Sequence, residues 1–256
     1  MDDLRTQLIA CCRRLRISSN LAERAMAAGD SSKQEYLYSL LKGELDERRK
    51  NRISRYINTA EFPRMYSRDE FRTEEVDFPS GVTFKSLLDL DFMKKGENVL
   101  MYGGTGTGKT MLSILIGLEA CRRERPVKFY RTAGLVNLLS ESHANGSLSQ
   151  LKKQLNTAKL LILDEFGYVP YDRTCSQLLF DYISEIYEKT PIILNTNLEF
   201  SQWVNVLYDI RMTTALIGRL TYHVELILFP GDNNRLKESS INKAFSRLNE
   251  NINAGA

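Results

Sequence analysis

The sequence has few of the residues that build disulfide-rich, metal-binding or membrane-embedded proteins. Its four cysteines include no Cys-x-x-Cys pair, and its two histidines allow no zinc-ligand spacing. The longest nearly apolar run, residues 111–118, is far short of the roughly 18 residues that a membrane-spanning helix requires. Residues 1–8 are acidic and lack the apolar stretch of a secretion signal. We therefore expect free thiols, a cytoplasmic location and no association with a membrane.

Glycine and proline are also scarce, with 15 and 6 residues, which excludes collagen-like and low-complexity chains. What the sequence does contain is 43% hydrophobic and 26% charged residues, enough to bury a core beneath a polar surface. A chain of 256 residues corresponds to one large domain, or to one domain with an appendage.

Positive charge is concentrated near the beginning of the chain. Residues 1–60 hold 12 Lys or Arg and 8 Asp or Glu, a net charge of +4, whereas the whole chain carries +3. A dense basic run neutralises phosphates and binds nucleic acid without reading its sequence, although it is also typical of a solvated helix face. The predicted DNA contacts in this run are Arg48, Arg49, Lys50 and Arg52.

Three regions of the chain differ in pattern. Residues 1–60 repeat apolar side chains at helical spacing and are expected to form a small helical region that binds DNA or a partner. Residues 61–86 contain aromatic side chains, acidic side chains and prolines, and their apolar residues show no sustained helical or strand periodicity. This second region is predicted to be a linker that packs on the next domain through its phenylalanines. Residues 87–256 are expected to form the main domain.

In the main domain, short runs rich in β-branched and aromatic residues alternate with helical stretches. Five such runs begin near residues 99, 127, 160, 192 and 224. Strands that are separated by helices pair in parallel and form a sheet that helices cover on both faces. The predicted fold is therefore α/β, with a parallel five-stranded sheet between helices.

The first predicted strand leads into a glycine-rich loop with a complete phosphate-binding pattern, Gly-x-x-x-x-Gly-Lys-Thr, and an apolar helix follows it. Glycines let backbone N–H groups approach phosphates, and the new helix directs its positive end at the same anion. Lys109 is expected to reach the β- and γ-phosphates of ATP, and Thr110 to ligate Mg²⁺. The predicted nucleotide-binding residues are Gly103, Gly104, Thr105, Gly106, Thr107, Gly108, Lys109 and Thr110.

A second acidic motif follows the apolar run that begins at residue 160. The run ends in Asp164 and Glu165, and carboxylates at the end of a buried parallel strand face the ligand crevice. Asp164 is predicted to hold Mg²⁺, directly or through water, and Glu165 to polarise the attacking water. An adjacent glutamate favours hydrolysis of ATP over binding alone.

Two later segments resemble parts of AAA+ ATPases. The strand near residue 192 ends in Asn-Thr-Asn, where these enzymes carry their first sensor of the γ-phosphate, and Asn197 matches the usual position. The segment Ile-Gly-Arg-Leu around Arg219 resembles the stretch that carries an arginine finger into a neighbouring subunit's nucleotide. Arg219 is the predicted finger, with Arg211 as a weaker alternative.

Residues 76–235 resemble the ATPase domain of the IstB family, the helper ATPases of a class of bacterial insertion sequences related to DnaC-type helicase loaders. The resemblance is carried by the stretches GGTGTGKT, LLILDEFGYVP, IILNTN and IGRL. Residues 1–60 are similar to the small DNA-engaging helical region of that family. The resemblance implies a P-loop AAA+ core preceded by a helical region.

The end of the sequence leaves no room for the helical lid that many AAA+ proteins carry, because the stretch after Phe229 is too short. We therefore expect no C-terminal lid, and a site that is completed by a neighbouring copy in a homo-oligomer. Arg235 is predicted as a second nucleotide-binding or interface arginine. The residues before Arg235 match the small–aromatic–Arg pattern of the family only loosely. The phosphate loop also departs from the family, because the proline that often follows its first glycine is absent.

The function that the resemblance implies is an ATP- and Mg²⁺-dependent ATPase that binds double-stranded DNA and assists a cognate transposase, through target selection and transposase stimulation. An alternative is a DnaC-type loader that grips a replicative helicase through residues 1–60. A small-molecule kinase and a nucleotide-gated scaffold without turnover also stay open, although Glu165 and Asn197 suit water activation. Candidate DNA contacts in the main domain are Arg131, Lys152, Lys153 and Arg173.

Overall fold

The structure is a computed structural model that describes residues 2–27 and 29–231. These residues belong to two compact units, residues 1–55 and residues 56–256. The units divide after residue 55, inside helix α3 (Ser31–Ala60), whereas the sequence pattern predicts a boundary after residue 60. The expected absence of a lid concerns residues 232–256, which lie outside the described part of the chain.

The first unit is a small group of helices made by α1 (Asp2–Leu15), α2 (Asn20–Ala27) and the beginning of α3. Its core contains the buried side chains of Leu8, Cys12 and Ala22, and partly buried residues of all three helices pack against them. Isolated helices as short as α1 and α2 are marginal in water, so this shared apolar contact is what stabilises them. The helical region predicted for the start of the chain is present.

Among the apolar residues that recur at helical spacing in α3 are Tyr36, Leu37, Leu40 and Leu41, and only some of these are partly buried. Leu37 and Leu41 pack against the core of the first unit, whereas Tyr36 and Leu40 are 66% and 52% exposed. Successive residues are turned by about 100° around a helix, so the two pairs lie on different faces of α3. The stripe that faces the core is therefore narrower than the sequence pattern suggests.

The second unit is built on a sheet of five strands, and every pair of neighbouring strands is parallel. The order across the sheet is β2-β3-β4-β1-β5. The predicted α/β fold and the predicted strands are confirmed. The strands are β1 (Asn98–Gly103), β2 (Val127–Arg131), β3 (Leu160–Phe166), β4 (Ile192–Thr196) and β5 (Val224–Phe229).

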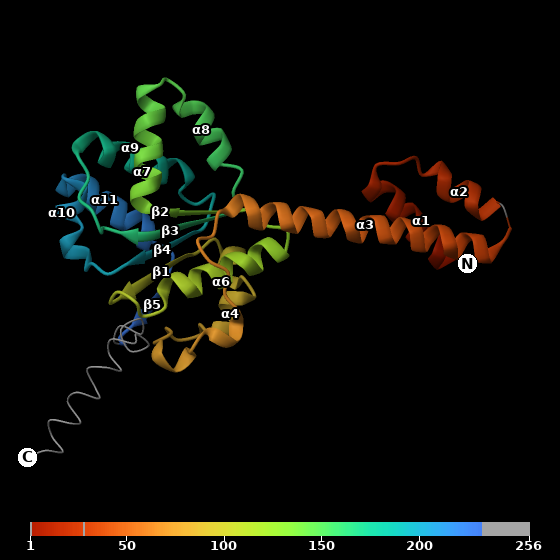
Figure 1. Ribbon diagram of the computed structural model, residues 1–256, viewed down its shortest axis with the longest axis horizontal. Coiled ribbons are helices and arrows are strands. Elements are labelled where there is room, and N and C mark those ends of the chain that lie inside the picture. The colour runs from red at the N-terminus through yellow and green to blue at the C-terminus, as the bar shows by residue number, and fades with distance from the viewer. Residues whose placement is uncertain (1, 28, 232–256) are drawn as a thin grey trace, which may run out of the picture. The chain divides into compact units, whose positions relative to one another are not determined.

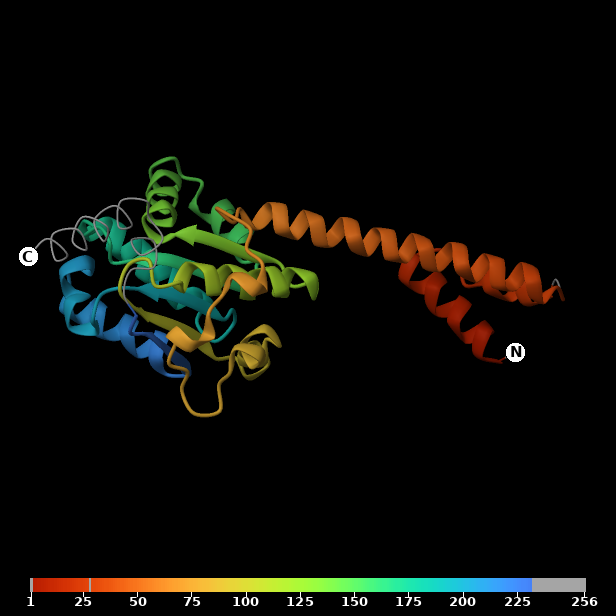
Figure 2. The ribbon, with the colours of Figure 1, turned by 60° about the horizontal axis from the view of Figure 1, so that its bottom comes forward.

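Helices cover both faces of this sheet, and Figures 1 and 2 show α6 on one side and α7 on the other. In the described part of the chain, no helix combines the length and the apolar character that a membrane span needs. The helices of the unit are α4 (Phe84–Leu88), α5 (Asp91–Lys95), α6 (Lys109–Arg122), α7 (Thr132–Ala144), α8 (Leu148–Leu155), α9 (Arg173–Ile186), α10 (Val204–Leu207) and α11 (Ile210–Thr221), with short 3₁₀ turns η1 (Arg68–Glu70), η2 (Thr73–Glu75) and η3 (Phe200–Gln202).

The strands divide their side chains between two hydrophobic clusters, one on each face of the sheet. In β3, Leu160 and Ile162 belong to the cluster that contains α6, while Leu161 and Leu163 belong to the cluster that contains α7 and α9. Successive side chains of a strand point to opposite faces, so a continuous apolar run such as β3 serves both clusters at once. This double burial fixes β3 in the interior of the sheet.

The segment between α3 and α4 belongs to the second unit and packs closely on the sheet and α6 of that unit. Its Phe71 ring stacks on Phe84 with 5.2 Å between the ring centroids. Asp77 exchanges two backbone hydrogen bonds with Leu228 of β5, at 2.9 and 3.1 Å. The aromatic side chains and the backbone bridge therefore hold this irregular segment against the sheet and α6.

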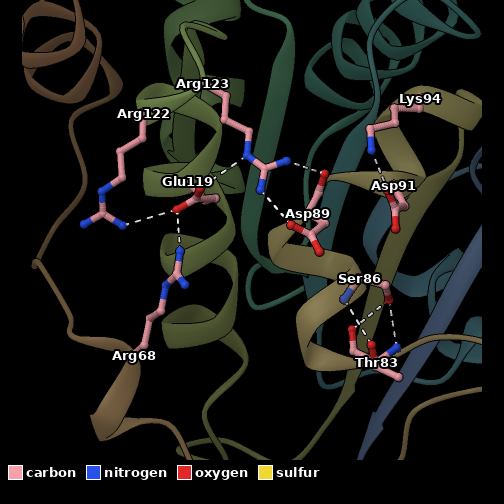
Figure 3. A network of polar contacts seen from close by, with 9 residues as sticks. All are labelled: Arg68, Thr83, Ser86, Asp89, Asp91, Lys94, Glu119, Arg122 and Arg123. Carbon is pink, nitrogen blue, oxygen red and sulfur yellow. Dashed lines mark hydrogen bonds and ion pairs between the residues drawn. The ribbon is translucent and has the colours of Figure 1, made fainter.

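A buried carboxylate of α6 ties the same segment to the core, as Figure 3 shows. Glu119 accepts hydrogen bonds from Arg68 of η1 at 2.6 Å and from Arg123 at 3.2 Å, and Arg122 lies 3.4 Å away. Arg123 also donates to the Asp89 side chain at the end of α4. Burial raises the pKa of Glu119, but the arginine hydrogen bonds outweigh it and hold that pKa below its ordinary value of 4.5.

Replacing Glu119 by alanine should lower the free energy of unfolding by about 2 kcal/mol, because three arginines lose a shared, largely buried acceptor. Chemical denaturation followed by circular dichroism measures this loss. Since the folded pKa is depressed, the difference from wild type is present above the ordinary pKa of 4.5 and should disappear as the pH falls through the lowered value.

The matched control is Asp91→Ala, which removes an exposed pair with Lys94 on α5. It should change stability by less than about 0.5 kcal/mol. Equal losses for the two variants at neutral pH would show that the Glu119 network contributes no more than a surface ion pair.

Candidate nucleotide-binding site

The predicted site residues come from three neighbouring strands that end at the same edge of the sheet. The strand order places β4 between β3 and β1, and parallel strands all present their carboxyl ends on one side. The glycine-rich loop follows β1, and Asp164 and Glu165 lie near the end of β3. The structure therefore brings the phosphate loop and the acidic pair together, although they are far apart in the sequence.

The glycine-rich loop has backbone angles that explain its composition. Gly106 and Gly108 have φ values of +80° and +108°, a region that side chains with a Cβ rarely adopt. Helix α6 begins at Lys109, directly after the loop. Its free N–H groups and the positive end of its dipole therefore lie where a phosphate would bind.

The Lys109 side chain is held over this loop. Its Nζ donates hydrogen bonds to the carbonyl oxygens of Gly103 and Gly104, both at 2.6 Å. A cation in this position, beside the N-terminus of a helix, adds a point charge to an existing anion site. This position suits the contact with the β- and γ-phosphates that the sequence predicts for Lys109.

Thr110 and Asp164 form the part of the site that suits a divalent cation. The Thr110 hydroxyl lies 3.0 Å from each carboxylate oxygen of Asp164, and Asp164 is only 4% exposed. Mg²⁺ prefers oxygen ligands and is usually held by one or two protein groups together with water and substrate phosphates. One hydroxyl and one carboxylate beside a phosphate loop match that requirement, so the two residues fit the predicted Mg²⁺ role.

An irregularity in β3 separates the two carboxylates. The pairing with β4 shifts register between Leu163 and Phe166, and Glu165 has a φ of +55°, which is uncommon for a residue with a side chain. Asp164 is consequently buried, while the Glu165 side chain is 49% exposed. Bulges of this kind re-aim side chains next to functional sites. Glu165 is thereby turned toward solvent, where an attacking water is available.

Asn195 is a site residue that the sequence pattern did not identify. It is 1% exposed, and its amide donates to the Asp164 carboxylate at 2.8 Å. Asn197, the predicted sensor, is exposed two positions later, and its role stays a prediction. The sequence does contain a signal for Asn195, because a polar residue there interrupts an apolar strand near its end. The neighbouring strand β3 carries Asp164.

A cavity of about 460 Å³ adjoins the phosphate loop. One wall is the loop and the start of α6, and the other is the irregular segment around η1 and η2. Within this wall, the Arg64 guanidinium lies 4.9 Å from the centre of the Tyr66 ring. The cavity is lined by Arg64, Tyr66, Asp69, Glu70, Phe71, Arg72, Glu75, Gly106, Thr107, Gly108, Lys109, Thr110 and Met111.

Arg219 lies at the opposite edge of the sheet from the phosphate loop. It is in the last turn of α11, stacks on Phe180 at 5.0 Å and donates to the Ala215 carbonyl. It lines a cavity of about 330 Å³ together with Asn98, the first residue of β1. The structure therefore does not bring Arg219 to the loop of its own chain. Arg235 is outside the described residues.

Several predicted DNA contacts already engage carboxylates. Arg131 lies 3.6 Å from Glu165, Lys152 lies 2.9 Å from Glu185, and Arg48 lies 2.6 Å from Glu44. The remaining predicted contacts are exposed, apart from Arg52, which is half-buried. The remaining contacts are Arg49, Lys50, Arg52, Lys153 and Arg173.

Comparison with known families places most of the chain in one of them. The model of the IstB-like ATP binding protein family matches residues 14–242. An ATP-binding protein of insertion sequence IS5376 from Geobacillus stearothermophilus is 32% identical over 210 residues, which cover 82% of this chain and 84% of that protein. The corresponding protein of insertion sequence IS21 from Pseudomonas aeruginosa is 31% identical over 208 residues, which cover 80% and 77%.

Solved structures share the fold of about two thirds of this chain. A replication initiator DnaA bound to AMPPCP and single-stranded DNA matches with a TM-score of 0.50 and 19% identity, covering 68% of this chain and 56% of that one. A DNA replication initiation factor matches with the same TM-score and coverage at 21% identity. At this level of identity the similarity concerns the fold, and it agrees with the predicted AAA+ architecture.

Replacing Lys109 by alanine should weaken nucleotide binding at least tenfold, about 1.4 kcal/mol, because the phosphates lose their counter-ion. Equilibrium titration with a fluorescent ATP analogue measures the affinity. The control is Lys85→Ala, which removes an exposed lysine outside the cavity beside the loop. An affinity of the Lys109 variant within about threefold of wild type would contradict the role assigned to this lysine.

Proposed function

The chain belongs to the family of IstB-like ATP-binding proteins, and from this premise we propose that it is the DNA-binding helper ATPase of an insertion sequence. The fold and the family support an ATPase of the AAA+ type. The observation that carries the proposal is the assembly of Lys109, Thr110, Asp164 and Glu165 at one edge of the sheet. The relatives named for insertion sequences IS5376 and IS21 support a role in transposition.

Each residue of the site has a distinct task in the proposed reaction. Lys109 and the N-terminus of α6 bind the phosphates, while Thr110 and Asp164 would hold Mg²⁺, which would supply positive charge against the negative charge of the phosphates. Glu165 accepts a proton from the attacking water, and Asn197 is proposed to contact the γ-phosphate or that water. The exposed position of Glu165 and the buried position of Asp164 suit this division between water activation and metal binding.

We propose that Arg219 acts on the nucleotide of a neighbouring copy. The strand β1 has six residues, about 20 Å at 3.3 Å per residue, and it separates the edge that carries Arg219 from the edge that carries the loop. A side chain cannot span that distance within one chain. The cavity around Arg219 also contains Lys94, Lys95 and Lys189, a cationic lining that suits an incoming triphosphate.

DNA is the proposed second ligand, bound through its phosphates. The first unit contributes the basic run of α3, and the second unit contributes Lys153 and Arg173 as exposed cations. Phosphate contacts of this kind position a protein without reading sequence. The proposed partner is the cognate transposase; a protein that binds a replicative helicase instead, and no transposase, would be a helicase loader of the DnaC type.

Arg219→Ala should bind ATP nearly as well as wild type but hydrolyse it at least 100-fold more slowly. An arginine supplied across an interface stabilises the transition state and so raises the rate of hydrolysis by a large factor. Lys109→Ala should be inactive for the opposite reason, since it cannot hold the nucleotide. Mixing the two variants creates interfaces where an intact finger faces an intact loop. Phosphate release by the mixture should therefore exceed the sum of the separate rates.

Mixed oligomers must first be demonstrated, for example with two different affinity tags and a pull-down in the presence of ATP. A mixture that co-assembles and yet is no more active than its components would refute action in trans. Arg211, on the first turn of α11, would then be the next arginine to test.

DNA binding should depend steeply on salt and little on sequence. Arg48 also donates to the Leu15 carbonyl and pairs with Glu44, so its removal would disturb helix packing as well as charge. Replacing Arg49 and Lys50 by glutamine should flatten the slope of log K against log[salt] by up to about 2. Fluorescence anisotropy at several salt concentrations measures the slope, and Lys85→Gln with Lys159→Gln is the charge-matched control. A slope equal to that of the control would place the DNA contacts outside this run.

A further inference from the structure

A chain of buried hydrogen bonds lies behind the predicted metal-binding carboxylate. Asn195, at the end of β4, joins Asp164 of β3 to Ser113 of α6 with contacts of 2.8 and 2.9 Å. Asn195 is 1% exposed and Ser113 is completely buried. Neither residue belongs to the cavity beside the phosphate loop. These hydrogen bonds therefore reach Asp164 from the interior of the protein and not from the side of the nucleotide.

The chemistry of the three groups fixes the direction of every bond. An ionised carboxylate only accepts hydrogen bonds, so the Asn195 amide must turn its NH₂ group toward Asp164. Its carbonyl oxygen then faces Ser113 and needs a donor. The Ser113 hydroxyl has one hydrogen, and although it also lies 3.0 Å from the Lys109 carbonyl, the Asn195 oxygen is the acceptor that would otherwise be left unsatisfied.

Two side chains contact the Asp164 carboxylate from different sides. Thr110 lies 3.0 Å from both oxygens on the side of the loop, and Asn195 donates to Oδ1 from the interior. Metal-binding carboxylates are commonly oriented by hydrogen bonds from residues that do not touch the metal, and removing such a partner typically weakens metal binding by about 10- to 100-fold. The geometry here has that form.

We propose that Asn195 is a positioning residue that aligns the Asp164 carboxylate for Mg²⁺, with Ser113 fixing the orientation of its amide. The proposal rests on the proposed ATPase function, since it concerns the metal of the same site. It assigns Asn195 a role distinct from that proposed for Asn197, which is exposed and would meet the nucleotide itself. Asn195 acts only through Asp164.

The test is the affinity of the site for Mn²⁺, used as a spectroscopic substitute for Mg²⁺, in the presence of a non-hydrolysable ATP analogue. Electron paramagnetic resonance counts free Mn²⁺ in a titration of the full chain. Asn195→Leu keeps a similar volume but has no donor, and it should weaken Mn²⁺ binding by about 10- to 100-fold. Binding of the same analogue in EDTA should stay within threefold of wild type, because the phosphate loop is unchanged.

Two further variants separate positioning from general damage. Glu165→Gln should lose hydrolysis and keep Mn²⁺ affinity, because Glu165 takes no part in the buried hydrogen bonds that link Asp164, Asn195 and Ser113. Ser113→Ala should weaken Mn²⁺ binding less than Asn195→Leu, because the amide keeps its NH₂ group but loses the partner that orients it. If Asn195→Leu does not fold by circular dichroism, Ser113→Ala carries the test, and unchanged Mn²⁺ affinity in it overturns the proposal.

The outcomes distinguish this inference from the proposed function. Wild-type protein that binds the nucleotide with no effect of Mn²⁺ and does not release phosphate would refute the ATPase itself. Wild-type protein that binds Mn²⁺ with the analogue, together with a folded Asn195→Leu variant of equal Mn²⁺ affinity, would refute only the role of Asn195. A parallel loss of analogue affinity in EDTA would identify Asn195 as a structural residue and also overturn the proposal.

Discussion

Parallel pairing of β3, β4 and β1 is the constraint on which the site depends. Because these strands run in one direction and lie side by side, their carboxyl ends meet at one edge, and the phosphate loop, Asp164 and Asn195 meet there with them. The backbone hydrogen bonds of the sheet hold these ends at a fixed spacing. Helix α6 then starts from the same edge, so its N-terminus and its Lys109 are positioned by the sheet as well.

Burial of the Asp164 carboxylate is costly for folding and useful for function. A charged group removed from water requires hydrogen bonds or a counter-ion, and the folded chain supplies donors from Thr110 and Asn195. A site prepared in this way has its acidic ligand oriented before a cation arrives. The positive φ of Glu165 is a second local cost at the same place, and strain of this kind concentrates at functional sites.

The irregular segment between α3 and α4 contributes to the site although it has almost no regular structure. Arg68 reaches the buried Glu119 of α6, Phe71 stacks on Phe84, and Asp77 bridges to Leu228 through the backbone, so a charge network, an aromatic contact and a backbone bridge hold the segment. Residues of this segment form a wall of the cavity beside the phosphate loop. Local rigidity here therefore derives from tertiary contacts rather than from backbone pattern.

The sequence by itself determined the strands, the phosphate loop and the acidic pair, because each is a local pattern: apolar runs bounded by turns, glycines with a lysine and threonine, and carboxylates at a strand end. Only the tertiary structure decided which polar residue of Asn-Thr-Asn faces Asp164, since that depends on strand order and on a bulge in β3. It also decided that Tyr36 and Leu40 lie outside the core of the first unit, and that Arg219 lies across the sheet from its own loop. Such facts depend on which elements become neighbours, and a local pattern holds no information about distant neighbours.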